Sequence, residues 1–158
     1  MNREKKFYLT KEGLEKRKRE YQDLQKIKSL KASGNVPNIF HSEEINPEYI
    51  SYQEDLLLLE NRLAELEDIL KNFQLIKSPS KEKQNIISLG ARVLVEVDGQ
   101  EDEFEIVGTL EANPPLGKIS NESPVGRALL GHRVGDEVVV SSPIKTIYKI
   151  KKIKYKLN

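Results

Sequence analysis

The sequence contains no cysteine and no tryptophan, and it has one methionine and two histidines among its 158 residues. Without cysteine the chain cannot form a disulfide, a thiolate metal site or a cysteine nucleophile, which is compatible with a reducing compartment. No apolar run approaches the roughly 20 residues that span a bilayer, and the charged residues 1–8 lack the apolar core of a signal peptide. We therefore expect a cytoplasmic protein that does not contact a membrane.

Recognisable enzyme motifs are also lacking. The sequence has no P-loop, no Rossmann glycine pattern and no serine elbow. His41 and His132 have no second histidine or cysteine at the spacing of metal ligands, so we expect neither to bind a metal. The protein is expected to act on a large partner rather than to catalyse a reaction alone.

The net charge of +1 is distributed unevenly along the chain. Residues 1–34 contain 11 basic and 5 acidic residues, a net charge of +6, whereas residues 43–68 contain 9 acidic residues and one basic residue, a net charge of −8. Two interpretations fit this pattern. The two segments attract one another as neighbouring helices, or the basic segment binds a partner.

A heptad pattern runs through the second of these segments. Its apolar residues alternate at spacings of three and four, which predicts a helix that buries one narrow seam against a second helix. Asn46 is a favourable N-cap and Pro47 a favourable first residue, so the helix is expected to span residues 47–74. The residues of the seam are Tyr49, Tyr52, Leu56, Leu59, Leu63, Leu66, Leu70 and Phe73.

A looser apolar stripe in residues 10–33 predicts the partner helix. Thr10 is a possible N-cap, but the position three residues later is Gly13 rather than glutamate, which is only part of a capping box. The connection over residues 34–45 is long for a turn between two helices, and a long loop there indicates function. Glu43 and Glu44 in this loop could bring oxygen ligands to a Mg²⁺ ion held elsewhere, or they could serve only solubility.

The periodicity changes to strand-like alternation after a linker at residues 77–84. We expect a helical hairpin at residues 1–76 and a mixed, mainly antiparallel sheet domain at residues 85–158, which is an α+β fold. Strands are expected at residues 92–97, 103–107, 137–141 and 146–155, a turn at Asp98-Gly99 and a short helix at residues 124–130. The lysine-rich last strand fits a solvated edge strand as well as it fits a contact with nucleic acid.

The stretch GKISNESPVGRALLGHRVGDEVVV at residues 117–140, preceded by EIVGTLEANPPLG, resembles the signature of the bacterial Gre transcript-cleavage elongation factors (GreA/GreB-like). YLTKEGLEKRKREYQDL and EYISYQEDLLLLENRLAELEDIL resemble the two arms of the coiled coil in this family. The resemblance covers nearly the whole chain, and its parts occur in the order found in the family.

This resemblance implies an N-terminal antiparallel coiled-coil finger that enters the secondary channel of RNA polymerase, and an FKBP-like C-terminal antiparallel sheet domain that docks at the channel entrance. The polymerase performs the cleavage of backtracked RNA, and acidic residues at the tip help to hold a Mg²⁺ ion of its active site. No intrinsic cofactor is expected. The implied partners are RNA polymerase and the nascent RNA and DNA of the elongation complex, and the protein is expected to be a monomer.

The resemblance assigns candidate residues to each role. The tip acids and metal ligands are Glu43 and Glu44, with Glu48 as a further candidate, although the family register places Ser42 and Ile45 at the two acidic positions. A regulator that occupies the channel without stimulating cleavage therefore remains an alternative. The candidates for polymerase docking are Ser123, Pro124, Gly126, Arg127, Leu130 and Gly131. Apart from the resemblance, the basic residues Arg17, Lys18 and Arg19 could contact RNA, or they could form a solvated helix face.

An FKBP-type peptidyl-prolyl isomerase is the remaining alternative, because LLGHRVGDEVVVSSP also resembles a stretch of FKBP domains. An isomerase pocket should be lined with aromatic side chains, yet the second half of the chain has only Phe104, Tyr148 and Tyr155. This scarcity of aromatic residues argues against isomerase activity.

Overall fold

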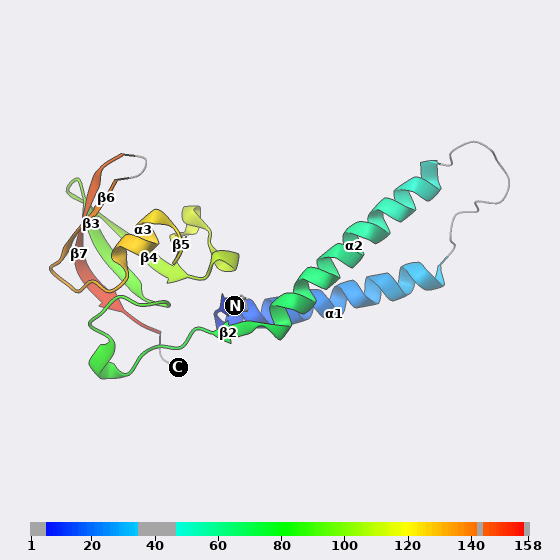
Figure 1. Cartoon of the computed structure of the whole chain (residues 1–158), viewed down its shortest axis with the longest axis horizontal. Helices are drawn as coiled ribbons and strands as arrows, with labels where there is room; N and C mark the ends of the chain where they lie inside the picture. The colour runs from blue at the N-terminus through cyan, green and yellow to red at the C-terminus, as the bar shows by residue number, and fades with distance from the viewer. Residues whose placement is uncertain (1–5, 35–46, 142–143, 157–158) are drawn as a thin grey trace, which may run out of the picture. The chain divides into compact units, whose positions relative to one another are not determined.

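The computed structural model describes residues 6–34, 47–141 and 144–156. The chain divides into two compact units, which we describe separately (Figure 1). One unit comprises Leu14–Asn72, and the other combines Met1–Gly13 with Phe73–Asn158. The expected domains were a hairpin at residues 1–76 and, after a linker at residues 77–84, a sheet domain at residues 85–158. The observed units differ from these bounds at both ends of the helical segment.

The first unit is a hairpin of two antiparallel helices, α1 (Lys11–Ser33) and α2 (Pro47–Lys71) (Figure 1). Helix α2 begins at the predicted proline, but its predicted end at Gln74 is wrong, because residues 73–75 form a strand. The seam shifts near this end: Ile69 is buried, whereas the predicted Leu70 is only half-buried. The buried apolar residues of this unit are Leu14, Leu59, Leu63, Leu66 and Ile69.

Two short strands were not predicted from the sequence. β1 (Phe7–Leu9) pairs in parallel with β2 (Phe73–Leu75), and Leu9 is fully buried. β1 precedes the helical hairpin in the sequence and β2 follows it. The two strands therefore connect the two ends of the hairpin to the second unit.

A capping interaction fixes the start of α1 within the second unit. The Thr10 hydroxyl accepts a hydrogen bond from Gly13 N (3.1 Å), as the N-cap of a capping box does. The reciprocal acceptor is Glu111, whose carboxylate accepts hydrogen bonds from Thr10 N (2.7 Å) and from the Thr10 hydroxyl (2.5 Å). A Cβ atom at Gly13 would overlap this carboxylate. The glycine therefore leaves room for a glutamate from a distant part of the chain.

The second unit also contains a five-stranded sheet in the order β5-β4-β3-β7-β6. Only the β4–β5 pair is parallel, as expected for a mixed, mainly antiparallel sheet. Helix α3 (Pro124–Leu129) packs on one face, where Leu129 joins the buried core (Figure 1). The strands are β3 (Arg92–Val97), β4 (Gln100–Val107), β5 (Lys118–Ser120), β6 (Glu137–Val140) and β7 (Thr146–Lys154), and three short 3-10 helices are η1 (Lys81–Lys83), η2 (Thr109–Glu111) and η3 (Pro114–Leu116).

The turn between β3 and β4 lies at Asp98-Gly99, as predicted. Both residues have positive φ angles, 52° and 78°, which match a two-residue hairpin turn that favours the sequence Asp-Gly. The predicted first strand has the observed bounds, whereas β4 begins three residues earlier than predicted, because the pairing with β3 continues to the turn.

Of the two interpretations of the lysine-rich strand, the edge strand is wrong, because β7 lies between β3 and β6. One of its lysines pairs with an acidic residue of β3: Lys151 Nζ lies 2.8 Å from the Glu96 carboxylate. This ion pair lowers the pKa of Glu96 and raises that of Lys151, the hydrogen bond between them being the largest cause. The lysine pattern therefore belongs at least partly to a charge-paired sheet surface.

Candidate functional site

The loop that joins α1 to α2 carries the predicted tip acids. Glu43 and Glu44, together with Ser42 and Ile45, lie outside the described residues. Glu48 is exposed in the first turn of α2. The described part of the chain thus shows the two helices that lead into the loop.

An Arg–Glu pair joins the two helices. Arg62 Nε and Nη2 of α2 donate to the two carboxylate oxygens of Glu20 on α1, at 2.7 and 3.0 Å. These hydrogen bonds lower the pKa of Glu20 and raise the pKa of Arg62. Arg62 also pairs with Glu65 at 3.0 Å on its own helix. Arg62, the one basic residue within residues 43–68, is therefore engaged by two carboxylates.

Lysines of α1 pair with acids of α2 further toward the loop. Lys28 Nζ lies 3.7 Å from a Glu60 oxygen, and Lys31 Nζ lies 3.7 Å from an Asp55 oxygen. These contacts support the interpretation that the oppositely charged helices attract one another. That interpretation does not account for every basic residue of α1.

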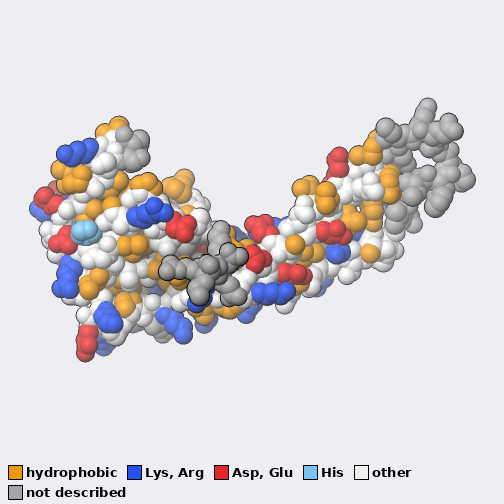
Figure 2. All heavy atoms as spheres, in the orientation of Figure 1, with side chains coloured by type: hydrophobic (Ala, Val, Ile, Leu, Met, Phe, Trp, Pro, Cys, Tyr) orange, Lys and Arg blue, Asp and Glu red, His pale blue; other side chains and the backbone are white. Residues whose placement is uncertain are grey.

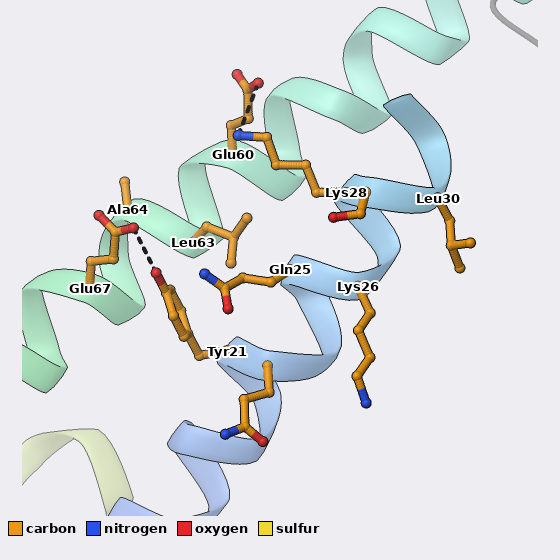
Figure 3. A pocket seen from close by; sticks show the side chains of 11 residues that line it. Tyr21, Gln25, Lys26, Lys28, Leu30, Glu60, Leu63, Ala64 and Glu67 are labelled. Atoms are coloured by element: carbon orange, nitrogen blue, oxygen red, sulfur yellow. Dashed lines mark hydrogen bonds and ion pairs between the residues drawn. The ribbon is translucent and has the colours of Figure 1, made fainter. Parts of the chain in front are cut away.

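An open groove runs between the helices on one side of the hairpin and has a volume of about 920 Å³ (Figure 3). Leu63 and Ala64 line it from α2, and the Tyr21 hydroxyl donates to Glu67 across it at 2.8 Å. This hydrogen bond raises the pKa of Tyr21. Gln25 also lines the groove, and the Tyr21–Glu67 hydrogen bond and the Lys28–Glu60 ion pair join the two helices beside it.

The candidates for RNA contact lie in the first half of α1. Lys18 and Arg19 are exposed, whereas Arg17 is half-buried. Successive residues of a helix are rotated by about 100°, so these three side chains do not share one surface. The structure does not bring Arg17, Lys18 and Arg19 together as one basic patch.

The segment before α3 is held by a network around Ser123. The Ser123 hydroxyl donates to Ser120 O (2.6 Å) and accepts from Gly126 N (3.1 Å), which makes Ser123 the N-cap of α3, and Pro124 follows as the first helical residue. Gly126 is buried, and a Cβ atom there would overlap the Ser120 carbonyl oxygen. Ser123 and Gly126 therefore set the position of α3 against the end of β5.

The predicted docking residues differ in their exposure. Pro124 and Arg127 are exposed on α3, and Leu130 is half-buried behind the helix. Gly131 has a φ angle of 84°, and its N–H donates to Ile87 O at 2.8 Å. The side chains that this segment presents most fully to solvent are thus Pro124 and Arg127.

Two kinds of feature are absent from the described part of the chain. Within residues 6–34, 47–141 and 144–156, no group of three or more His, Cys, Asp or Glu side chains could hold a metal ion. No helix in the same part of the chain is both long and apolar enough to cross a membrane. Phe104 and Tyr148 make an edge-on contact beside the core, and the Tyr155 hydroxyl donates to Ile86 O, so these three aromatic residues have structural contacts.

Comparisons with known proteins identify relatives over most of the chain. Residues 82–155 match the family described as transcription elongation factor, GreA/GreB, C-term. The chain is 38% identical over 141 residues to transcription elongation factor GreA of Thermomicrobium roseum, and the aligned region covers 88% of this chain and 90% of that protein. It is 41% identical over 148 residues to transcription elongation factor GreA of Clostridium acetobutylicum, and the aligned region covers 90% of this chain and 92% of that protein.

A structural comparison finds the GreA factor homolog 1 (Gfh1) protein of Thermus thermophilus at a TM-score of 0.42 and 27% identity, covering 95% of this chain and 99% of that one. Because the sequence relatives exceed 30% identity over about nine tenths of their length, they decide the assignment. The chain belongs to the GreA/GreB family of transcription elongation factors.

Proposed function

We propose that this protein is a transcription elongation factor that binds RNA polymerase, inserts the loop between α1 and α2 into the secondary channel and promotes cleavage of backtracked RNA. The observation that carries the proposal is the similarity over about nine tenths of the chain to relatives named transcription elongation factor GreA. The polymerase breaks the RNA bond, and the protein acts as a monomer that supplies side chains to the polymerase active site.

Glu43 and Glu44 are the proposed tip acids. Carboxylate oxygens are the donors that Mg²⁺ prefers, so two adjacent glutamates fit a metal ion shared with the polymerase. When bound, the ion stabilises the charge that develops on the phosphate and activates the attacking water. Glu48 is the third candidate, and its exposed place in the first turn of α2 puts it beside the same loop.

Docking is assigned to the segment that contains α3. Ser123 and Gly126 hold the helix in place, while Pro124 and Arg127 supply the exposed contacts. An arginine on a short, well-anchored helix can make paired hydrogen bonds to a carboxylate of the partner. Lys18 and Arg19 on α1 are exposed and remain the proposed contacts to the nascent RNA or DNA, together with Arg17.

A second function is favoured by the loop sequence itself. The family register places Ser42 and Ile45 where cleavage-stimulating members carry acids. Neither side chain can ligate Mg²⁺ as a carboxylate does. A regulator that occupies the channel without stimulating cleavage would match these two residues, provided that Glu43 and Glu44 do not reach the metal ion.

Transcript cleavage in a backtracked RNA polymerase complex tests both functions. The protein is compared with Glu43→Ala/Glu44→Ala, and polymerase binding is measured in the same reactions. The matched control is Glu101→Ala/Asp102→Ala, which removes two adjacent exposed carboxylates from β4.

Each outcome has a distinct meaning. Faster cleavage with the native protein and the control, but not with the bound loop variant, supports the cleavage function. Binding without faster cleavage by the native protein supports the channel-occupying regulator. If the native protein does not bind the polymerase, the proposed function is wrong.

A further inference from the structure

Four consecutive leucines, Leu56 to Leu59, occur in α2. Residues in a helix advance by about 100° each, so four in a row span about 300° of its circumference and cannot all face one neighbouring helix. The structure shows this division: Leu59 is buried and Leu56 half-buried against α1, whereas Leu57 is 57% exposed and Leu58 is 68% exposed. The two central leucines therefore contribute little to the stability of the hairpin.

These leucines are part of a larger apolar surface on the side of α2 away from the seam. Ile50 lies two helical turns before Leu57, on nearly the same side, and is 38% exposed. Three exposed aliphatic side chains on one stretch of helix cost solubility and need a reason, whereas single exposed ones do not. In Figure 2 hydrophobic and acidic side chains lie next to one another over this part of the hairpin.

The charges around the leucines limit what can bind there. Residues 47–61 contain four acidic residues and no lysine or arginine. Two of the acids, Asp55 and Glu60, are paired with lysines of α1, whereas Glu54 lies one turn before the leucines and is exposed. An acidic rim repels the phosphates of RNA and DNA. It complements a protein surface on which an apolar patch is bordered by lysine or arginine.

The position of the surface connects it with the loop. Leu57 is ten residues after Pro47, where α2 begins, so it lies about 15 Å along the helix from the start of α2. Any partner that surrounds the loop must also approach this part of α2. This step rests on the proposed function, in which that partner is RNA polymerase.

We infer that Ile50, Leu57 and Leu58 form a contact surface for an apolar, basic-rimmed wall of the polymerase channel. The leucines provide the affinity by leaving water on insertion, and Glu54 pairs with a cation at the rim. The surface would hold α2 at one depth and rotation in the channel, and so position the loop.

The test measures the affinity of the full-length protein for RNA polymerase core enzyme. Because the chain has no cysteine, one cysteine added after Asn158 accepts a single fluorophore for anisotropy. Leu57→Gln/Leu58→Gln removes the apolar surface but keeps good helix-forming residues. Leu116→Gln is the matched control, since Leu116 is 71% exposed in the other unit. Glu54→Lys tests the charge of the rim without changing the leucines.

The expected result is at least tenfold weaker binding for Leu57→Gln/Leu58→Gln, weaker binding for Glu54→Lys and less than a twofold change for Leu116→Gln. Far-UV circular dichroism should show equal helix content in all proteins. If the double variant binds within twofold of the native protein, or if Leu116→Gln weakens binding as much, the inference is overturned while the proposed function stands.

Two other results also overturn the inference. If the native protein does not bind the polymerase, the proposed function fails and this contact surface fails with it. If analytical ultracentrifugation shows that the native protein self-associates and that the double variant is monomeric, the leucines serve a second copy of the chain.

Discussion

The capping box of α1 is completed by Glu111, which lies 101 positions from Thr10 in the sequence. We therefore predict that Gly13→Ala changes the free energy of unfolding in opposite directions in the presence and in the absence of the Glu111 side chain. Glu111 accepts the Thr10 N–H that a glutamate at Gly13 would accept in an ordinary capping box. Gly13 in the first turn of a helix is normally unfavourable. Here a Cβ atom at position 13 would overlap the Glu111 carboxylate, which would have to move away from Thr10.

The expected magnitudes follow from this geometry. Glu111→Ala removes a charge-assisted hydrogen bond to a half-buried backbone N–H, which should lower the free energy of unfolding by about 1.5–3 kcal/mol. In the Glu111→Ala background, Gly13→Ala should raise the free energy of unfolding by about 0.5–1 kcal/mol, because alanine favours the helix. In the native background Gly13→Ala should lower the free energy of unfolding, since the loss of the hydrogen bonds from Thr10 to Glu111 costs more than the helix propensity of alanine contributes.

Thermal unfolding followed by far-UV circular dichroism measures the four proteins of this cycle. In a domain of 60–100 residues, about 1 kcal/mol corresponds to a shift of about 4–8 °C in Tm. Native-state hydrogen exchange at the Thr10 and Gly13 amides locates the effect, because these two N–H groups are the ones that the capping box satisfies.

The reasoning would be refuted if Gly13→Ala stabilised both backgrounds equally. That result would mean that Glu111 and position 13 do not compete for the same space, and that the coupling energy is near zero. Unchanged exchange of the Thr10 amide in Glu111→Ala would refute the capping role by a separate route.

Three further predictions concern the two units. The pKa of Glu20 in the folded protein lies below its ordinary value of 4.5. The Glu20–Arg62 pair should therefore stabilise the hairpin fully above about pH 4.5, and this stabilisation should be lost as the pH falls through the lowered pKa. In that lower pH range the urea midpoints of the native protein and of Glu20→Gln should converge. Gly126→Ala should lower the free energy of unfolding by about 1–3 kcal/mol in thermal denaturation, because its Cβ would overlap the Ser120 carbonyl. Arg127→Glu should weaken polymerase binding at least fivefold in a competition assay while leaving Tm unchanged, since the side chain is exposed.

Matched variants keep these predictions specific. Glu54→Gln removes an exposed acid of α2 and is the matched control for the loss of one carboxylate from the hairpin. Arg127→Ala changes the neighbour of Gly126 and should shift the unfolding free energy by less than about 0.5 kcal/mol. Arg133→Glu introduces the same charge reversal in the loop after α3, and equal loss of binding there would argue against a specific role for Arg127.

Sequence reasoning was most successful where a local signal sets the structure. The Pro47 start of α2, the Ser123-Pro124 start of α3 and the Asp98-Gly99 turn were all predicted, because each depends on the backbone preferences of adjacent residues. Attraction between the oppositely charged helices was one of two interpretations of the sequence, and the Lys28–Glu60 and Lys31–Asp55 ion pairs support it.

Features that depend on distant residues could not be predicted in this way. β1 and β2 are three residues each, and only their mutual pairing reveals them as strands. The partial capping signal at Thr10 gave no indication that Glu111 completes it. The position of β7 inside the sheet depends on strand order, which an alternating pattern of lysines does not report. The roles of Glu43 and Glu44 and of the α3 segment stay predictions, because they depend on a partner.

The parallel pairing of β1 with β2 has a consequence for the order of folding. Phe73 follows Leu9 by 64 residues, and closing so long a flexible loop is entropically costly. A helical hairpin that forms first brings its own two ends together, and so shortens the loop that these strands must close. Helices also form faster than sheets with distant pairings. During synthesis the first strand therefore cannot pair until residues 73–75 have been made, and Thr10 cannot complete its capping box until Glu111 has been made.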